Sequence, residues 1–245
     1  MRLPGAFTAG EAAAMVDAVW RFFERRSAVR RDDPASWTPH PAVSTKGLKR
    51  SRVFDPLVRN DSVRSALDGI FGTGGWNPPA PGAQVLVTFP SGGPDAWRVP
   101  SELWHMDCGF DKPTWPPFAV KLFACMGEMR PRGGATFALA GSHRLVEPFG
   151  ATLAPDDRGG NKRTWGRFMR QTEWLTSLGT PGPEPERSER LLAGTSDVDG
   201  MPVRVVEMCG DPGDVYVTHL HVFHCASANV RDRPRLMLGK AISAV

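Results

Sequence analysis

The stretch Gln84-Val85-Leu86-Val87-Thr88-Phe89 marks a change of pattern in this chain, from helical spacing before Pro81 to short β-type runs after it. Its apolar and β-branched residues are typical of a strand. Five further runs of this kind follow, at 118–126, 135–138, 203–208, 214–218 and 235–242. Short strands separated by Gly/Pro turns favour a sandwich or barrel over a parallel α/β sheet. We therefore predict a mainly β core.

The N-terminal segment is predicted to add flanking helices to this core. Thr8 and Glu11 have the spacing of a capping box, in which each side chain binds the other's backbone N–H. Apolar residues then recur at helical spacing from Ala12 to Phe23, and a second helix is expected over 62–70. The proline-punctuated stretch 34–41 between the two helices is predicted to be a loop.

Residues 150–200 interrupt the series of strands. The residues of this region that form an amphipathic helical stripe are Trp165, Phe168, Met169, Thr172 and Leu175. The breaker-rich segment TPGPEPERSE (180–189) is predicted to be an exposed loop. An insertion of this length is more often functional than idle. We therefore expect one domain, 1–245, with an inserted helical lid at 150–200.

Composition and charge argue against several classes of protein. The 245 residues carry a net charge of +4, and the basic residues form neither a stripe nor a recognisable nucleic-acid-binding module. The four cysteines, Cys108, Cys125, Cys209 and Cys225, are far apart without a C-x-x-C pair, which favours reduced thiols. No apolar run approaches the length of a membrane span or of a signal-peptide core. We expect a soluble cytoplasmic protein with no nucleic-acid or membrane partner.

The tripeptide His105-Met106-Asp107 is the first candidate for a metal site. Residues two apart on a strand share a face, so the imidazole and the carboxylate could both reach one ion. Alone, this pair is weak evidence, because such a tripeptide also occurs on surfaces and in turns.

The second candidate element is the segment GDVYVTHLHVFH at 213–224, which contains His219, His221 and His224. One of these histidines could complete a set of two histidines and one carboxylate around iron(II). That set leaves three coordination positions open for a co-substrate and dioxygen. Spacing alone does not choose among the three histidines.

The third element is Arg235, in the run Asn229-Val-Arg-Asp-Arg-Pro-Arg235. A guanidinium group matches a carboxylate with two parallel hydrogen bonds. An arginine beside an iron site can therefore anchor the distal carboxylate of 2-oxoglutarate. A lone arginine is more often a solvated charge, and it is the conjunction of the three elements in this order that supports the hypothesis.

These motifs together resemble the phytanoyl-CoA dioxygenase-like branch of the iron(II)/2-oxoglutarate oxygenases. The family pattern W-H-x-D matches Trp104–Asp107, and the Gly-rich turn into G-S-H-R matches Gly133–Thr136 followed by Gly141–Arg144. The two C-terminal patterns of the family match 213–224 and 229–235. The resemblance runs in order over most of the chain, but it is thin over 28–80 and 150–200.

The resemblance implies a set of roles. It makes His105, Asp107 and His224 the iron ligands, because the family places its distal ligand five residues before the asparagine. His219 aligns with a frequent non-ligand histidine, and His221 has no family role. The co-substrate arginine is Arg235, with Arg233 as the alternative. The implied fold is a double-stranded β-helix (jelly roll, cupin-like), which agrees with the strand pattern.

The resemblance also implies a reaction. Iron(II), 2-oxoglutarate and dioxygen would oxidise a small organic molecule. Similar polar residues in relatives line the co-substrate pocket, so Gln84 and Thr88, four apart on one strand, are candidates for that role. A pair of hydrogen-bonded barrel residues is an equal alternative. Halogenating relatives lack the carboxylate of Asp107, so hydroxylation is favoured here.

The substrate is the least determined feature. A basic stretch with Arg158, Lys162, Arg163, Arg167 and Arg170 could receive an anionic or carrier-linked substrate, although the solvated face of a lid helix explains it more simply. The abundance of Arg, Ala, Gly and Pro suggests a bacterial source and secondary metabolism. Two alternative functions remain open: a cupin-type metal enzyme that does not use 2-oxoglutarate, and a catalytically silent jelly-roll binding module.

Overall fold

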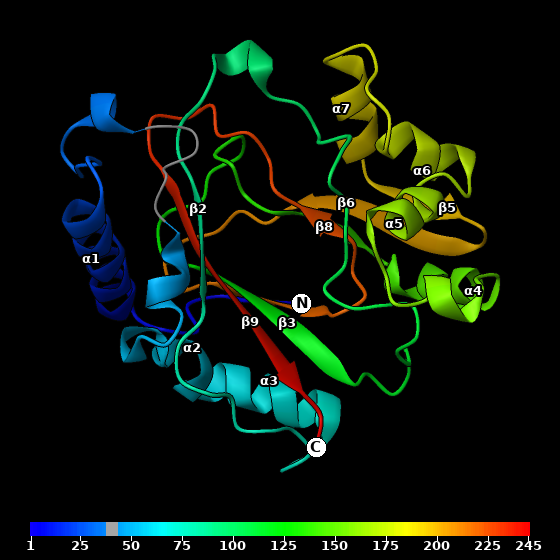
Figure 1. Cartoon of the computed structure of the whole chain (residues 1–245), viewed down its shortest axis with the longest axis horizontal. Helices are drawn as coiled ribbons and strands as arrows, with labels where there is room; N and C mark the ends of the chain where they lie inside the picture. The colour runs from blue at the N-terminus through cyan, green and yellow to red at the C-terminus, as the bar shows by residue number, and fades with distance from the viewer. Residues whose placement is uncertain (38–43) are drawn as a thin grey trace.

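Two antiparallel β-sheets lie face to face in the computed structural model, which describes residues 1–37 and 44–245 (Figure 1). The five-stranded sheet has the order β1-β7-β3-β9-β2. Its strands are β1 (Arg2–Leu3), β7 (Val215–His219), β3 (Ala119–Cys125), β9 (Arg235–Ser243) and β2 (Gln84–Thr88). The long pairings of β3 with β7 and β9 place the centre of this sheet at β3.

The four-stranded sheet has the order β5-β6-β4-β8. Its strands are β5 (Thr195–Val198), β6 (Met201–Glu207), β4 (Phe137–Ala140) and β8 (His224–Cys225). The predicted β core is therefore confirmed, and each of the six predicted runs overlaps a strand. Strand β4 begins two residues later than the run predicted at 135–138. The backbone oxygens of Ala135 and Thr136 instead accept hydrogen bonds from the Ser227 hydroxyl and the Met208 N–H, outside the ladder of β4.

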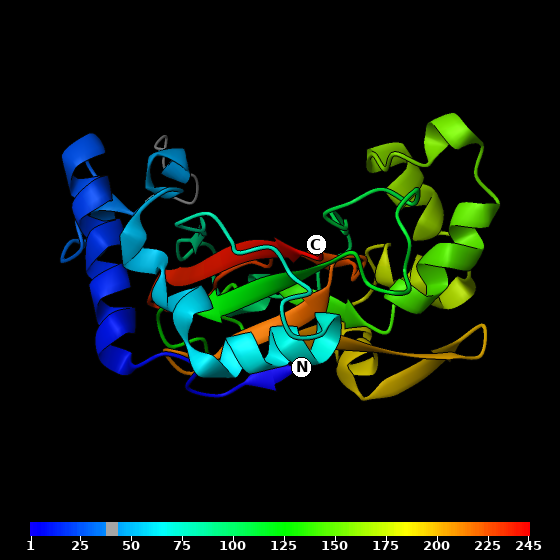
Figure 2. The same ribbon diagram turned by 90° about the horizontal axis from the view of Figure 1, so that it is seen from below.

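Helices cover the outer face of the five-stranded sheet (Figure 2). They are α1 (Ala9–Arg26), α2 (Pro56–Arg59) and α3 (Asp61–Phe71). The predicted capping box of α1 is present: the Glu11 N–H donates to Thr8 Oγ1 at 3.2 Å, and the Thr8 N–H donates to the Glu11 carboxylate at 2.8 Å. The apolar stripe of α1, including Met15, Val19 and Phe23, is buried against the sheet. The predicted loop 34–41 lies partly outside the described residues, and short 3₁₀ turns occur at Pro34–Ser36, Thr45–Leu48, Arg52–Phe54, Pro94–Ala96 and Pro155–Asp157.

A second group of helices packs on the outer face of the four-stranded sheet. It consists of α4 (His143–Ala151), α5 (Lys162–Phe168), α6 (Glu173–Leu178) and α7 (Glu186–Leu192). The predicted helical stripe is divided between α5 and α6, because α5 ends at Phe168 and Thr172 caps a new helix by accepting from the Leu175 N–H at 3.2 Å. No helix in the described residues is long and apolar enough to cross a bilayer.

The prediction of an exposed loop at 180–189 is wrong in its second half. Residues from Glu186 onward belong to α7, and Arg187 is only 5% exposed. Its guanidinium donates to the backbone oxygens of Val99 at 2.7 Å and Leu178 at 2.6 Å, and pairs with Glu184. These bonds compensate the burial of the charge, so the helix is fixed to the segment before His105.

The Gly-Asp pair at the start of β7 has a structural role. Gly213 has a φ of +101°, and a Cβ there would lie 2.1 Å from the Phe7 carbonyl oxygen. Asp214 is buried, and its carboxylate accepts from the Gly5 N–H at 2.9 Å and pairs with Arg2. This motif therefore attaches the N-terminus to the five-stranded sheet.

A third, smaller apolar cluster lies between the two sheets and includes Phe123, Ala138 and Met237. It does not fill the interior. Alternation along β3 and β9 directs Lys121 and Arg235 to the same side as Phe123 and Met237. The interior between the sheets therefore contains charged groups, which is where the candidate site is found.

Candidate metal centre

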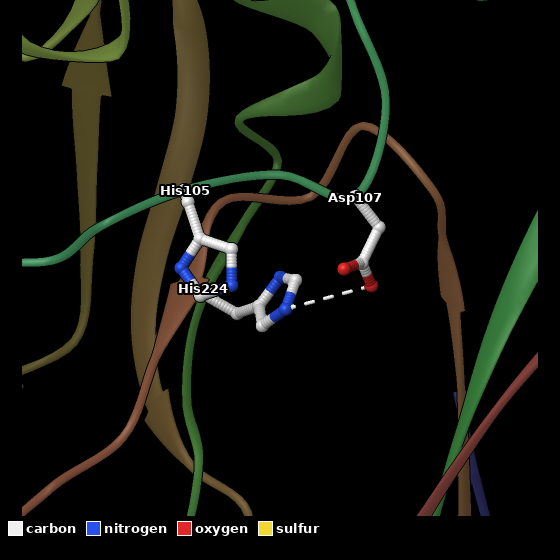
Figure 3. Close-up of side chains that lie close together, drawn as sticks. All are labelled: His105, Asp107 and His224. Carbon is white, nitrogen blue, oxygen red and sulfur yellow. Dashed lines mark ion pairs between the residues drawn. The ribbon is translucent and has the colours of Figure 1, made fainter. Parts of the chain in front are cut away.

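The side chains of His105, Asp107 and His224 converge at one point (Figure 3). One ligand atom from each residue lies within 4.8 Å of the other two. The Nε2 atom of His224 is 3.7 Å from Oδ2 of Asp107, and the centroids of the two imidazole rings are 4.5 Å apart. Two imidazoles and one carboxylate can bind iron(II) on one side and leave its other positions free.

Strand β8 carries His224, and an isolated β-bridge joins His105 to it. The His105 N–H donates to the His224 oxygen at 3.0 Å, and the His224 N–H donates back at 2.8 Å. Asp107 follows in a bend. The expectation that His105 and Asp107 share a regular strand is therefore wrong, because the ladder at this edge is only one residue pair long. The ligands meet across the bridge instead.

Both imidazoles are oriented by the backbone oxygen two residues earlier. Nδ1 of His105 lies 2.8 Å from the Leu103 oxygen, and Nδ1 of His224 lies 3.0 Å from the Val222 oxygen. These bonds leave Nε2 of each ring available to a metal. Leu103 has a φ of +62°, an unusual conformation for leucine. Burial lowers the pKa of His224 to about 4, so the ring is in the neutral form that binds metals.

Lys121 is a member of this site that the sequence analysis missed. Its Nζ atom is 2.8 Å from Oδ2 of Asp107, and its side chain is 12% exposed. Burial alone would raise the pKa of Asp107, but the hydrogen bond and the charge of Lys121 lower it below its usual value, with a smaller electrostatic contribution from the two imidazoles. Gly239 on β9 leaves room for the lysine, since a Cβ there would lie 3.3 Å from its Cε. The sequence signal for this buried lysine was its place among the inward-facing residues of an otherwise apolar strand, β3.

Replacing Lys121 with methionine is expected to tighten iron(II) binding about tenfold, because the variant loses a positive charge near the cation and frees the Asp107 carboxylate. Competition with a chelator under argon measures this affinity. Lys46→Met, at an exposed position, is the control and should leave it unchanged. Weaker binding by Lys121→Met would instead mean that the lysine orients Asp107 for the metal.

Arg235 is a buried cation that lacks an acidic partner among the described residues. It is 4% exposed, and its Nη atoms donate to the hydroxyl oxygens of Thr88 at 3.2 Å and Thr136 at 2.6 Å. Its Nε atom is buried without a partner. Burial lowers its pKa to about 10, so it is still charged at neutral pH. A buried guanidinium with a free donor fits the carboxylate of a bound ligand.

The other predicted co-substrate residues differ in their placement. Thr88 contacts Arg235, and its backbone oxygen accepts from Asn229 Nδ2 at 3.0 Å. Gln84 shares the inward side of β2 but is exposed, and it pairs with Gly239, four residue pairs along the ladder from Arg235. Arg233, the alternative anchor, is also exposed. Thr136 is a further residue that the sequence analysis missed.

His143, His219 and His221 lie apart from the three converging side chains. The rings of His143 and His219 are stacked with centroids 5.1 Å apart, and those of His219 and His221 likewise. His219 Nε2 lies 2.9 Å from the Thr114 oxygen, and His221 Nε2 lies 3.2 Å from the Gly109 oxygen. Burial lowers the pKa of His143 and of His221 to about 4. This stack therefore holds the loop that contains Gly109 and Thr114, and it is not part of the metal centre.

This stack predicts that the free energy of unfolding falls as the pH drops from 6.5 toward about 4. In that window the unfolded histidines bind protons that the folded ones do not, so acid favours the unfolded chain. For His221, which is fully buried, the loss should be roughly 1–2 kcal/mol. Urea unfolding at both pH values, compared between the wild type and His221→Gln, measures it. An equal loss in both proteins would contradict the prediction.

Comparison with known proteins extends over almost the whole chain. The family model "Phytanoyl-CoA dioxygenase (PhyH)" matches residues 2–237. No curated protein sequence matches the chain. Three solved structures of similar fold are notable. The epimerase SnoN, in complex with Fe3+, alpha ketoglutarate and nogalamycin RO, has 18% sequence identity and a TM-score of 0.56, with 99% of this chain and 78% of that chain covered.

The other two structures give similar values. HygX from Streptomyces hygroscopicus, with nickel and 2-oxoglutarate bound, has 15% identity and a TM-score of 0.50, and the match covers 99% of this chain and 81% of that one. EvdO2 from Micromonospora carbonacea var. aurantiaca has 17% identity and a TM-score of 0.50, covering 99% and 85%. At these identities the likeness is one of fold.

The match over residues 2–237 confirms the resemblance found in the sequence. It also supports iron and 2-oxoglutarate as the cofactors, because the three converging side chains suit the metal and Arg235, which has no acidic partner in the described part of the chain, suits a carboxylate. The chain belongs to the phytanoyl-CoA dioxygenase family, and its centre is that of a non-haem iron enzyme that depends on 2-oxoglutarate.

Proposed function

We propose that this chain is an iron(II)- and 2-oxoglutarate-dependent dioxygenase that hydroxylates a small organic molecule, in bacterial secondary metabolism. The observation that carries the proposal is the pairing of two features between the same sheets. One is the set of three ligands around a single point, and the other is the buried Arg235 without an acidic partner in the described residues. A metal enzyme that does not use 2-oxoglutarate has no use for the second feature.

In this proposal each residue has a defined task. His105, Asp107 and His224 hold iron(II), and the Leu103 and Val222 oxygens keep both rings turned toward it. Arg235 binds the distal carboxylate of 2-oxoglutarate, with Thr88 and Thr136 orienting the guanidinium. The bound iron, 2-oxoglutarate and dioxygen supply the oxidising power, and the protein supplies position and a dry site. Gln84 would line the outer end of the co-substrate pocket.

The architecture of this proposal is a single double-stranded β-helix domain. The two facing antiparallel sheets support it. The helical part of residues 150–200 would act as the lid, because α5 lines a pocket with His105 and α5 and α6 pack on the four-stranded sheet. The end of the predicted lid does not take part, since Thr195–Val198 forms β5 of that sheet. A small-molecule substrate suits such an enclosed site.

Succinate release tests the proposal. Protein loaded with iron(II) and 2-oxoglutarate under argon should form succinate once oxygen is admitted, and slow release without substrate is sufficient. The weak visible band of the iron–2-oxoglutarate chelate, recorded before oxygen is added, is the second readout. The absence of both signals would favour the silent binding module.

The mass of the product separates hydroxylation from other outcomes. A product that gains one oxygen atom supports the proposed reaction. A product of unchanged mass would instead indicate a redox-neutral isomerisation such as epimerisation, the activity named for SnoN.

A further inference from the structure

A pocket of about 580 Å³ opens beside the metal centre, between residues 101–105, helix α5 with Met169 and Arg170 after it, and Gly179 and Thr180 after α6. His105 lines it, and the ring centroid of Trp165 lies 5.8 Å from that of His105. A molecule bound in this pocket therefore contacts a metal ligand directly. No other metal ligand and no part of the Arg235 site lines it, so it is distinct from the co-substrate position.

The lining of the pocket is largely apolar. Trp104, Trp165 and Met169 form its walls, and Leu103 at its rim is 71% exposed. The exposed Leu103 side chain adjoins these apolar walls, so it is free to contact a ligand bound in the pocket. A flat indole face next to an exposed aliphatic side chain suits a ring-bearing apolar ligand.

Two positive charges also line this pocket. Lys162 and Arg170 belong to its lining, and Glu102 is the one acidic residue there. Neither cation forms an ion pair within the described residues. The other basic residues of this stretch differ, because Arg167 pairs with Asp157 at 3.2 Å and Arg163 is exposed outside the lining. The charge available to a ligand is therefore that of Lys162 and Arg170.

Gly166 is a residue that helix propensity does not explain. It lies inside the short helix α5, where glycine costs about 1 kcal/mol relative to alanine. A Cβ at this position would lie 3.2 Å from Nη1 of Arg170 and 3.5 Å from Nη2. The glycine therefore leaves space for the guanidinium beside the pocket, one turn from Lys162.

We propose that the substrate is an organic anion with an apolar, ring-bearing body. Lys162 and Arg170 bind its carboxylate or phosphate group, and Trp165 and Leu103 bind its body next to His105. This inference rests on the proposed function, because it takes the pocket beside the metal centre as the substrate site. It also revises the role of the basic stretch, in which only these two residues face the ligand.

Calorimetric titration at low salt tests the inference without turnover. The protein is loaded with iron(II) and 2-oxoglutarate under argon, and the probes are 2-naphthoate, 2-naphthyl phosphate and the neutral 2-naphthamide. We expect at least one anion to bind about tenfold more tightly than the amide, since a charge-assisted hydrogen bond is stronger than a neutral one. The anion that binds more tightly identifies the group as carboxylate or phosphate.

Substitutions in and near the pocket show which residues cause the tighter binding of the anion. Lys162→Gln and Arg170→Gln should each weaken binding of that anion about tenfold and leave the amide unchanged. Arg163→Gln, on the same helix but outside the pocket, is the matched control and should behave as the wild type. Gly166→Ala keeps every charge but displaces the guanidinium of Arg170. It should therefore lower the affinity for the anion several-fold, while the helix gains stability. Trp165→Leu should weaken the binding of all three probes.

Equal affinity for the anions and the amide, or no binding of any probe, would overturn the inference. An equal loss of anion affinity in Arg163→Gln and Arg170→Gln would also overturn it. The preference for an anion would then come from the overall positive charge of the protein and not from the pocket. Failure of the proposed function gives a different result. In that case the iron–2-oxoglutarate band is absent, whereas a failed inference leaves the band intact and removes only the discrimination among probes.

Discussion

Replacing His224 with alanine is expected to abolish iron-dependent conversion of 2-oxoglutarate to succinate. The variant keeps one imidazole and one carboxylate, which cannot hold the ion in a three-ligand geometry. Loss of a residue that only orients a metal ligand weakens binding by about 10–100-fold, so loss of a ligand should cost at least about 100-fold. Anaerobic iron(II) titration measures the affinity, and succinate release after admission of oxygen measures the turnover.

His221→Gln is the matched control for this experiment at pH 7.5. The residue lies three positions before His224, and its ring stacks on His219 rather than facing the metal centre. This variant should retain both iron binding and succinate release. Iron binding by His224→Ala equal to that of the wild type would contradict the assignment of His224 and would make His219 or His221 the third ligand.

The choice among these histidines shows what residue spacing could not determine. Alternation along a strand fails here because β7 ends at His219 and a new two-residue strand begins at His224. The rings of His219 and His221 contact the oxygens of Thr114 and Gly109 in a distant loop, whereas the ring of His224 is oriented by the Val222 oxygen. The family pattern identified His224 because it records the outcome of those contacts. Spacing alone carries no such information.

The same distinction applies to the fold. The long strands β3, β6 and β9 were predictable because apolar residues persist over their seven to nine positions. The two-residue strands β1 and β8 were not, since only pairing with a remote partner defines them.

The interior charges Lys121 and Arg187 were missed for a related reason. Their compensating partners, Asp107 and the Val99 oxygen, are distant in the sequence. A charged residue is rarely buried without partners, and these partners are not adjacent in the sequence, so burial of Arg187 could not be predicted and that of Lys121 was indicated only by its inward position on β3.

Replacing Arg235 with methionine is expected to lower the affinity for 2-oxoglutarate and, at the same time, to stabilise the ligand-free protein. Removing one partner of a buried charge pair costs about 2–5 kcal/mol, which corresponds to a loss of affinity of roughly 30-fold or more. The ligand-free protein contains a guanidinium whose Nε atom is buried without a partner. An apolar side chain of similar length removes that cost. The melting temperature without 2-oxoglutarate should therefore rise.

The expected fall in 2-oxoglutarate affinity and the expected rise in melting temperature together make this experiment specific. A residue that merely holds the sheets together would lose stability when replaced, whereas a residue kept for a ligand gains it. Arg233→Met, at an exposed position two residues earlier, should change neither quantity, and iron(II) affinity should be the same in both variants. Should Arg235→Met bind 2-oxoglutarate as the wild type does, the metal centre would belong to an enzyme that does not use this co-substrate. A lower melting temperature together with normal 2-oxoglutarate binding would make the bonds to Thr88 and Thr136 the reason for the arginine.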